Sequence, residues 1–588
     1  MSVFEVWAPR AEKVELDSGG RTTPMERADR AGWWRAVAEP EAGRPDGPGP
    51  DYAFRIDGGA PRPDPRSRRQ PAGVHGPSRV DRPEAFPWTD ADWRGRPLRG
   101  AVLYELHIGT FTWEGTFEAA IGRLDHLVSL GVGFVEVMPV AAFNGVHGWG
   151  YDGVALWAVH EPYGGPEGLR RLVDACHARG IGVLLDVVYN HLGPSGNYLA
   201  EFGPYFTDAH VTPWGAAVNL DGPGSDEVRS FLVDNALYWL RENHLDGLRL
   251  DAVHALADTR AVHVLEQLSA AVDRLAADTG RRLHLIAESD LNDPRLVTPR
   301  EAGGTGLAAQ WSDDFHHALH AALTGERQGY YCDFGSLAAI ARTLSSGFFH
   351  DGTYSTYRGR CHGRPVDTSV LTADRFVVSL QTHDQVGNRA EGDRIGAGLS
   401  EGLRRVGAAL LLTAPFTPQL FMGEEWGAGT PWQYFTDHPE PELAAAVREG
   451  RRAEFARTGW PPDRVPDPQA PETFARSVLD WSEPDREPHR GLLDWYRSLI
   501  SLRRTRPALA DPDFARVAVA FDEEQRWLVV SRGDVQVAAN LSDRPCTPRL
   551  PRLEDGVAGV GVLLGSDPRI EVRDGGVALP PESVAVLG

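Results

Sequence analysis

The chain has 588 residues, of which 42% are hydrophobic and 24% are charged, a balance typical of globular proteins in water. Its 82 acidic residues outnumber its 60 basic residues and give a formal net charge of −22. This excess of negative charge argues against nucleic acid or an anionic membrane surface as a partner, because binding either one usually requires a basic patch.

The N-terminal segment does not resemble a secretory signal. MSVFEVWAPRAEKVEL contains no basic stretch followed by an apolar one, and no run in the chain approaches the ~20 apolar residues of a membrane span. The four cysteines show no CxxC pair and no zinc-ligand spacing, which is typical of a reducing compartment. We therefore expect a cytoplasmic protein that makes no membrane contact.

Short strand-like pieces alternate with turn residues over residues 1–95 and end in a stretch rich in Pro and Arg. This pattern predicts an N-terminal β-sandwich, immunoglobulin-like and similar to carbohydrate-binding modules, followed by an irregular linker. The basic cluster of Arg66, Arg68 and Arg69 in the linker indicates a solvated loop or an interdomain contact.

From residue 96 to 505, strand-like runs alternate with helical patterns, one of them over 116–131. Such βα units predict a parallel sheet, and eight of them closing on themselves form the (β/α)8 TIM barrel. The segment exceeds the ~250 residues typical of that fold, so we expect long insertions at 139–165 and 191–225. The eight strand candidates are AVLYELHI, FVEVMP, GVLLDVVYN, GLRLDAV, HLIAESD, AAQW, FVVSLQTHD and FTPQLFMGEEW.

Over residues 506–588 the helical patterns cease and the alternation typical of antiparallel strands returns. We expect a C-terminal antiparallel β-sandwich there. The fold class predicted for the chain is therefore α/β, with a TIM barrel between two β domains.

Several of the barrel strands end in an acidic residue at the point where the chain turns out of the strand. Burying an unpaired carboxylate is costly, so an acid at a strand exit is expected to face a cleft while the apolar run fills the core. Asp251, Glu288 and Asp384 come from three separate segments of this kind. Loops above a parallel barrel bring such segments into one site.

Three converging acids suit either a divalent metal site or acid-base and nucleophilic chemistry at a glycosidic bond. Arg249 lies two residues before Asp251, so the period of a strand points both side chains the same way. A guanidinium there would keep the attacking carboxylate ionised and repel a metal. We therefore favour the glycosidase and expect no catalytic metal and no cofactor. Aromatic residues on which sugar rings could stack crowd the candidate loops: Trp149, Tyr151, Trp157, Tyr163, Tyr189, Tyr198 and Trp214.

Four segments resemble the signature regions of the α-amylase superfamily of retaining glycosidases: DVVYNH, GLRLDAVH, LIAESD and QTHDQVGN. The resemblance implies that Asp251 is the nucleophile, Glu288 the general acid and then base, and Asp384 the third acid, which holds sugar hydroxyls. It also places Arg249 beside the nucleophile. The same resemblance implies three contacts to the sugar in the reacting subsite, from His191, His383 and Tyr151.

Two sequence segments resemble one group of enzymes within this superfamily. ESDLNDPR (288–295) and DDFHHALH (313–320) resemble malto-oligosyltrehalose trehalohydrolases, whereas the opening ELHIGTFTWEGTF and the N-terminal sandwich are shared with glycogen branching enzymes. This implies as ligands maltooligosyl trehalose and related α-glucans, cut at the α-1,4 bond before the terminal trehalose. Further substrate-binding candidates, each of which could instead be structural because polar residues at strand exits often cap the next helix, are His254, Asp313, Asp314, His317, Gln385 and Asn388.

The expected mechanism is a double displacement with retention. It requires the carboxyl groups of Asp251 and Glu288 to lie roughly 5–5.5 Å apart, and a pKa of Glu288 raised by burial and by nearby carboxylates. A branching transglycosylase with the same acids is the alternative enzyme. The remaining rivals are a catalytically silent glucan-binding protein and a metal hydrolase. We expect a monomer.

Overall fold

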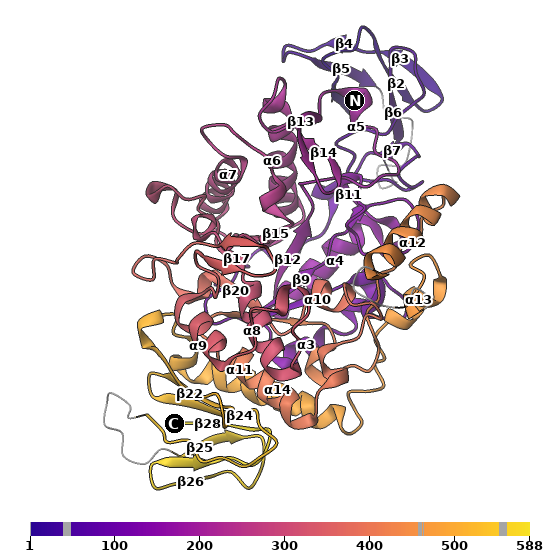
Figure 1. Ribbon diagram of the computed structural model, residues 1–588. Helices are drawn as coiled ribbons and strands as arrows, with labels where there is room; N and C mark the ends of the chain where they lie inside the picture. The colour runs from indigo at the N-terminus through magenta and orange to yellow at the C-terminus, as the bar shows by residue number, and fades with distance from the viewer. Residues whose placement is uncertain (1, 39–48, 457–460, 462–463, 552–560) are drawn as a thin grey trace.

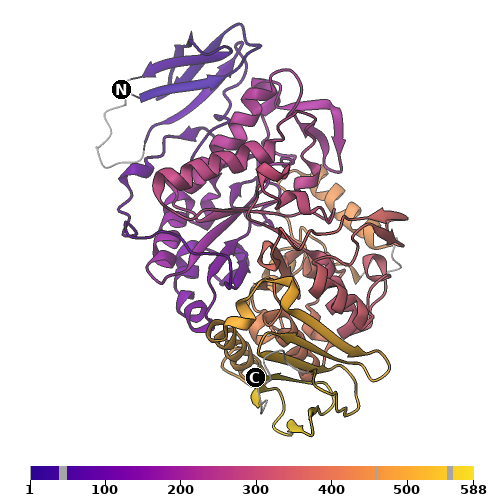
Figure 2. The same ribbon diagram turned by 90° about the vertical axis from the view of Figure 1, so that its left-hand side faces the viewer.

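The computed structural model describes all residues except 1, 39–48, 457–460, 462–463 and 552–560. Figure 1 shows the N-terminal strands at one end, the barrel in the middle and the C-terminal strands at the other end. Figure 2, turned by 90°, shows the same two β regions at opposite ends of the molecule. The division of the chain at residues 95 and 505 stays a prediction.

The centre of the molecule is a closed barrel of eight parallel strands, as predicted, in the order β12-β15-β16-β17-β20-β21-β8-β9. Every strand lies within one of the runs expected to form it. The strand residues are almost all buried, because helices cover the outside of a parallel barrel and side chains fill its inside. The strands are β8 (Leu103–Leu106), β9 (Phe134–Val137), β12 (Gly182–Val187), β15 (Gly247–Leu250), β16 (His284–Ala287), β17 (Ala309–Trp311), β20 (Phe376–Ser379) and β21 (Thr417–Phe421).

The helices expected between the strands are present with one difference. The pattern over 116–131 forms two helices, α2 (Phe117–Ile121) and α3 (Leu124–Leu130), separated at Gly122 and Arg123. Glycine is a poor helix former, which fits a break at this point. The other helices around the barrel are α4 (Gly165–His177), α6 (Ser225–Glu242), α7 (Val264–Thr279), α8 (Asp313–Thr324), α9 (Leu337–Ser346), α11 (Glu401–Leu412) and α14 (His489–Thr505).

The N-terminal region forms two antiparallel sheets, β1-β5-β4 and β3-β2-β6-β7, which confirms the predicted sandwich. Phe4, Val14, Leu16 and Phe54 are buried in its core. The strands are β1 (Ser2–Trp7), β2 (Val14–Ser18), β3 (Arg21–Pro24), β4 (Glu26–Arg27), β5 (Trp33–Ala38), β6 (Asp51–Ile56) and β7 (Ser78–Arg79).

The basic cluster of the linker makes interdomain contacts, one of its two expected roles. Arg66 pairs with Asp234, and Arg68 pairs with Glu242, both on α6. Arg69 reaches Glu161 and Glu167 at the start of the α4 region. These arginines therefore fix the linker to the barrel helices.

The C-terminal region is antiparallel, as predicted, with a five-stranded sheet β22-β23-β24-β28-β25 and a small sheet β26-β27. Val529, Ala538, Val577 and Ala585 share a buried cluster between them. The large sheet packs on α9 and α11 of the barrel. The strands are β22 (Val517–Asp522), β23 (Trp527–Arg532), β24 (Val535–Asn540), β25 (Val562–Gly565), β26 (Glu571–Arg573), β27 (Gly576–Ala578) and β28 (Ser583–Leu587).

Additional elements lie in the segments that connect the strands and helices of the barrel. The expected insertion 191–225 carries the hairpin β13 (Phe206–Thr212) and β14 (Gly215–Val218). A second hairpin, β18 (Thr353–Ser355) and β19 (Arg360–His362), lies between α9 and β20. Within the described part of the chain, no helix combines the length and apolarity needed to cross a lipid bilayer.

Candidate active site

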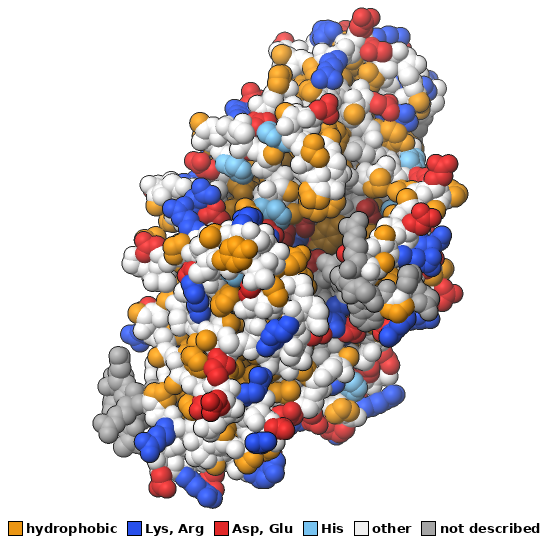
Figure 3. All heavy atoms as spheres, viewed as in Figure 1, with side chains coloured by type: hydrophobic (Ala, Val, Ile, Leu, Met, Phe, Trp, Pro, Cys, Tyr) orange, Lys and Arg blue, Asp and Glu red, His pale blue; other side chains and the backbone are white. Residues whose placement is uncertain are grey.

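The three predicted acids lie at the carboxyl end of the barrel strands, which is where TIM barrels build their sites. Asp251 directly follows β15 and Glu288 directly follows β16, while Asp384 lies in the short helix α10 (His383–Gly387) after β20. Figure 3 shows that this face of the molecule is hollowed near its centre, with acidic, apolar and histidine side chains around the hollow.

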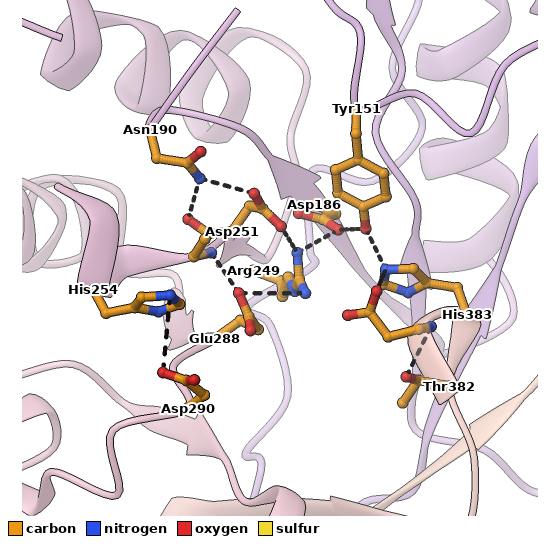
Figure 4. Close-up of polar contacts among 12 residues, drawn as sticks. Tyr151, Asp186, Asn190, Arg249, Asp251, His254, Glu288, Asp290, Thr382 and His383 are labelled. Carbon is orange, nitrogen blue, oxygen red and sulfur yellow. Dashed lines mark hydrogen bonds and ion pairs between the residues drawn. The ribbon is translucent and has the colours of Figure 1, made fainter. Parts of the chain in front are cut away.

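Arg249 lies at the base of the site and is fully buried. Its Nη1 donates to Oδ1 of Asp251 at 2.7 Å and to Oδ2 of Asp186 at 2.8 Å, and its Nη2 lies 3.9 Å from Oε2 of Glu288. The guanidinium also lies 4.4 Å from the centre of the Trp311 ring. Figure 4 shows the arginine between Asp251, Glu288 and Asp186. One cation therefore connects two of the predicted catalytic acids.

Both carboxylate oxygens of Asp251 have a donor. Oδ1 accepts from Arg249, and Oδ2 accepts from Nδ2 of Asn190 at 2.8 Å. The same amide also donates to the main-chain carbonyl of Asp251 at 2.8 Å. These bonds fix the orientation of the carboxylate, as expected of a nucleophile that must meet a carbon atom in one direction.

Glu288 is held by the backbone beside Asp251. The amide of Ala252 donates to Oε2 of Glu288, and Ala252 has a φ of +38°, a left-handed conformation that is uncommon for alanine and is tolerated where a site requires it. Burial raises the pKa of Glu288 to about 8; Asp251 and Asp384 add to the rise and Arg249 opposes it. A carboxyl group that keeps its proton at neutral pH can act as a general acid.

His383 begins a chain of hydrogen bonds across the site. Its Nδ1 lies 2.5 Å from Oε1 of Glu105 and its Nε2 lies 2.8 Å from the hydroxyl of Tyr151, which itself donates to Asp186 at 2.6 Å. Both ring nitrogens therefore act as donors, which requires the imidazolium form. Burial lowers the pKa of His383, but Asp384 and Glu105 outweigh it and raise the value to about 9.

Asp384 lies beside this chain, with its Oδ1 3.6 Å from Nε2 of His383 and its side chain 42% exposed. Asn388 donates to the same oxygen at 3.3 Å. Gln385 accepts from the amide of Thr382 at 2.7 Å and forms a capping box with it at the start of α10. Asn388 and Gln385 thus support the helix that carries Asp384, and their contact with substrate stays a prediction.

His191 directly follows Asn190, the residue that donates to Asp251. Its Nδ1 faces Oδ1 of Asn190 and its Nε2 lies 3.1 Å from the carbonyl of Tyr151. The ring stacks on Trp214 of the β13–β14 connection, at 4.6 Å between centres and 7° between planes. Trp214 is half exposed, so the insertion 191–225 brings an aromatic face to the site as expected of a ligand-binding loop.

Asp313 and Asp314, both at the start of α8, differ in their surroundings. Burial, together with Asp384 and other carboxylates, raises the pKa of Asp313 to about 7. Asp313 therefore lies close enough to Asp384 to be influenced by its charge. Asp314 accepts at 2.8 Å from the amides of Phe349 and His350 and from the side chain of Asn292. Its carboxylate therefore fixes loops in place, and a substrate contact stays a prediction.

The remaining predicted residues are His254 and His317. His254 is partly exposed, with its Nε2 3.8 Å from Oδ1 of Asp290. The ring of His317 lies 4.7 Å from that of Tyr330. Burial lowers the pKa of His317 to about 3, so this ring is neutral at physiological pH.

Three buried residues of the site were missed by the sequence reasoning: Glu105, Asp186 and Asn190. Asp186 and Asn190 belong to the DVVYNH string, and Glu105 is the acid of the first barrel strand. An acid inside an otherwise apolar strand is a signal, because its burial requires a partner. Among the described residues, no group of three or more His, Cys, Asp or Glu side chains has an arrangement that could hold a metal ion.

Comparison with known proteins gives two family matches. Residues 82–207 match the family described as the alpha amylase catalytic domain, and residues 512–586 match a domain of unknown function, DUF3459. These matches correspond to the first part of the barrel and to the C-terminal β region.

Relatives match over nearly the whole chain. The malto-oligosyltrehalose trehalohydrolase of Rhizobium sp. (strain M-11) is 56% identical, over 99% of this chain and 97% of its own length. The enzyme of the same name from Arthrobacter ramosus is 59% identical, over 92% and 93%. A crystal structure described as that of a candidate α-amylase from Salmonella typhimurium is 39% identical, with a TM-score of 0.89, over 100% of this chain and 97% of the other.

Proposed function

The chain belongs to the malto-oligosyltrehalose trehalohydrolase family of the α-amylase superfamily, and we propose that it hydrolyses the α-1,4-glucosidic bond next to the terminal trehalose of maltooligosyl trehalose. The products are free trehalose and a maltooligosaccharide. The protein is thus a glycosidase, and its substrate is an uncharged α-glucan, for which the net negative charge of the protein is no obstacle.

The observation that carries the proposed mechanism is the position of Arg249 between two acids with different surroundings. Asp251 has a donor on each oxygen, from Arg249 and Asn190, whereas burial raises the pKa of Glu288 to about 8. A retaining glycosidase requires two carboxyl groups in different environments, so that one can act as the general acid and the other as the nucleophile. Asp384, the third acid, lies within the electrostatic reach of Glu288.

In the proposed reaction, Asp251 attacks C1 of the glucose unit that precedes trehalose, while Glu288 gives its proton to the departing oxygen. A covalent glycosyl-enzyme ester forms and trehalose leaves. Glu288, now a carboxylate, takes a proton from a water molecule that attacks C1, which releases the maltooligosaccharide and restores Asp251. Asp384 holds sugar hydroxyls, and Tyr151, His191 and His383 surround the reacting ring.

The test is incubation of the purified protein with maltotriosyl trehalose and measurement of free trehalose by chromatography. We expect trehalose and maltotriose in equal amounts. A branching transglycosylase would transfer the glucan to a second chain and yield branched products, and a silent glucan-binding protein would leave the substrate intact. Either result would overturn the proposed function.

We also propose that the protein acts in the cytoplasm as a monomer. All four cysteines are free thiols and two of them, Cys332 and Cys361, are exposed, which suits a reducing compartment. Light scattering of the purified protein tests the oligomeric state.

A further inference from the structure

Hydrogen bonds connect the hairpin formed by β18 and β19 to the loop that follows Glu288. The side chain of Asn292 donates to the carbonyl of His350 at 3.0 Å, and the amide of Arg364 donates to the carbonyl of Asn292 at 3.1 Å. His350 precedes the hairpin in the sequence and Arg364 follows it, so both ends of the hairpin are bonded to this loop. The hairpin therefore has a fixed position relative to the proposed general acid.

Arg358, in the turn of this hairpin, reaches into that loop. Its Nη2 donates to Oδ2 of Asp290 at 2.9 Å and lies 3.4 Å from the carbonyl oxygen of the same residue. The amide of Arg358 in turn lies 3.4 Å from the hydroxyl of Ser355, across the turn. A guanidinium with two acceptors on one residue fixes that residue more closely than a point charge does.

Asp290 connects Arg358 to His254. While one oxygen of Asp290 faces Arg358, the other lies 3.8 Å from Nε2 of His254. Figure 4 shows His254 and Asp290 side by side, next to Glu288. His254 comes three residues after the proposed nucleophile and Asp290 two residues after the proposed acid, so this contact joins the segments that follow β15 and β16.

A hollow of about 330 Å³ lies beside His254, lined also by Val253, Ser289 and Leu291. Its volume falls at the lower end of the roughly 300–1,000 Å³ that small-molecule sites occupy. The side chains of His254 and Asp290 are 28% and 38% exposed, so both can contact a ligand. The mechanism described above assigns neither of them a chemical step.

We propose that Arg358 is a positioning residue for the leaving-group end of the cleft: it fixes Asp290, and Asp290 orients His254 toward the departing sugar units. The inference rests on the proposed function. Without the guanidinium, the carboxylate of Asp290 would rotate freely in solvent and His254 would lose its fixed partner. In the intact protein, the hairpin thus determines which leaving group is accepted, while Asp251 and Glu288 determine the chemistry.

The test compares two substrates with the same number of glucose units, maltotriosyl trehalose and maltopentaose. We expect Arg358→Ala to lower kcat/KM for release of trehalose about tenfold, as for the loss of one charge-assisted hydrogen bond, mainly through KM. Cleavage of maltopentaose should change less than about threefold. Arg358→Lys should restore part of the lost kcat/KM, because lysine keeps the positive charge but lacks the several fixed donors of the guanidinium.

Arg360→Ala is the matched control, because Arg360 lies in the same hairpin and donates to the carbonyl of Cys361; its kinetics should equal those of the wild type. Asp290→Asn should reproduce the selective loss, and combining it with Arg358→Ala should add little. Equal losses on both substrates, or none, would overturn the inference. If Arg358→Ala does not fold, Asp290→Asn decides in the same way. A wild-type protein that releases no trehalose would overturn the proposed function itself.

Discussion

Arg249 and Asp251 form an enclosed ion pair at the carboxyl end of β15, with Nη1 of the arginine 2.7 Å from Oδ1 of the aspartate. They are two positions apart in the sequence, so the strand period places both side chains on one face. The arginine is fully buried and binds Asp186 as well, at 2.8 Å. The pair therefore belongs both to the stability of the barrel interior and to the proposed chemistry.

Replacing the nucleophile should separate binding from turnover. Asp251→Asn keeps the shape of the side chain but removes the attacking charge, so we expect kcat to fall by roughly four orders of magnitude or more. Binding of maltooligosyl trehalose, measured by calorimetry, should be retained. Near-normal turnover would remove Asp251 as the nucleophile.

Arg249→Met should destabilise the protein as well as inactivate it. The substitution leaves Asp186 and Asp251 without their cation inside the barrel, and breaking a buried ion pair in this way costs about 3–5 kcal/mol. Thermal denaturation should therefore show a clearly lower Tm. The control is Arg260→Met, which removes an exposed pair with Asp226 and should leave Tm nearly unchanged; equal shifts for both variants would contradict the role of burial.

The pH dependence should report the general acid. Glu288 must be protonated to act, and its pKa is raised to about 8, so kcat/KM should be high below that pH and decline as pH rises through it. For Glu288→Gln acting on an α-maltosyl fluoride, whose leaving group needs no proton, this alkaline decline should be absent from the glycosylation step. A wild-type rate that rises through pH 8 would exclude Glu288 as the acid.

Removal of metal should not change activity. Arg249 occupies the position between Asp186, Asp251 and Glu288 with its own positive charge, and a divalent cation there would be repelled. We expect the same kcat before and after dialysis against EDTA. Lost activity that returns with added calcium or zinc would show that a metal takes part.

The barrel could be predicted from the sequence because its signal is local. Runs such as HLIAE combine strand propensity with an acid at the exit, and this pattern needs no knowledge of the partner strand. The helix over 116–131 was predicted as one element because its apolar period continues through Gly122. The structure divides it there, since the preference of a single glycine can outweigh a hydrophobic pattern.

The supporting residues of the site were harder to predict because their partners are distant. Glu105 meets His383 across 278 positions, and Asp186 meets Arg249 across 63. Nothing local shows that these acids pair with a cation inside the barrel. Gln385 shows the limit of the other kind, since a polar residue beside an acid can bind a ligand or cap a helix; its side chain caps α10, and its contact with substrate stays a prediction. The separation of 5–5.5 Å between the carboxyl groups of Asp251 and Glu288 stays a prediction.

The most direct measurement is identification of the trapped glycosyl-enzyme. A 5-fluoro-α-glucosyl fluoride slows both the formation and the hydrolysis of the glycosyl-enzyme, and it slows hydrolysis more. The covalent intermediate therefore accumulates, and the labelled peptide can be sequenced by mass spectrometry. We predict a single label on Asp251, and none in Asp251→Asn. A label on Glu288 or Asp384, or an unlabelled enzyme whose first product is the β-anomer, would contradict the double displacement at Asp251.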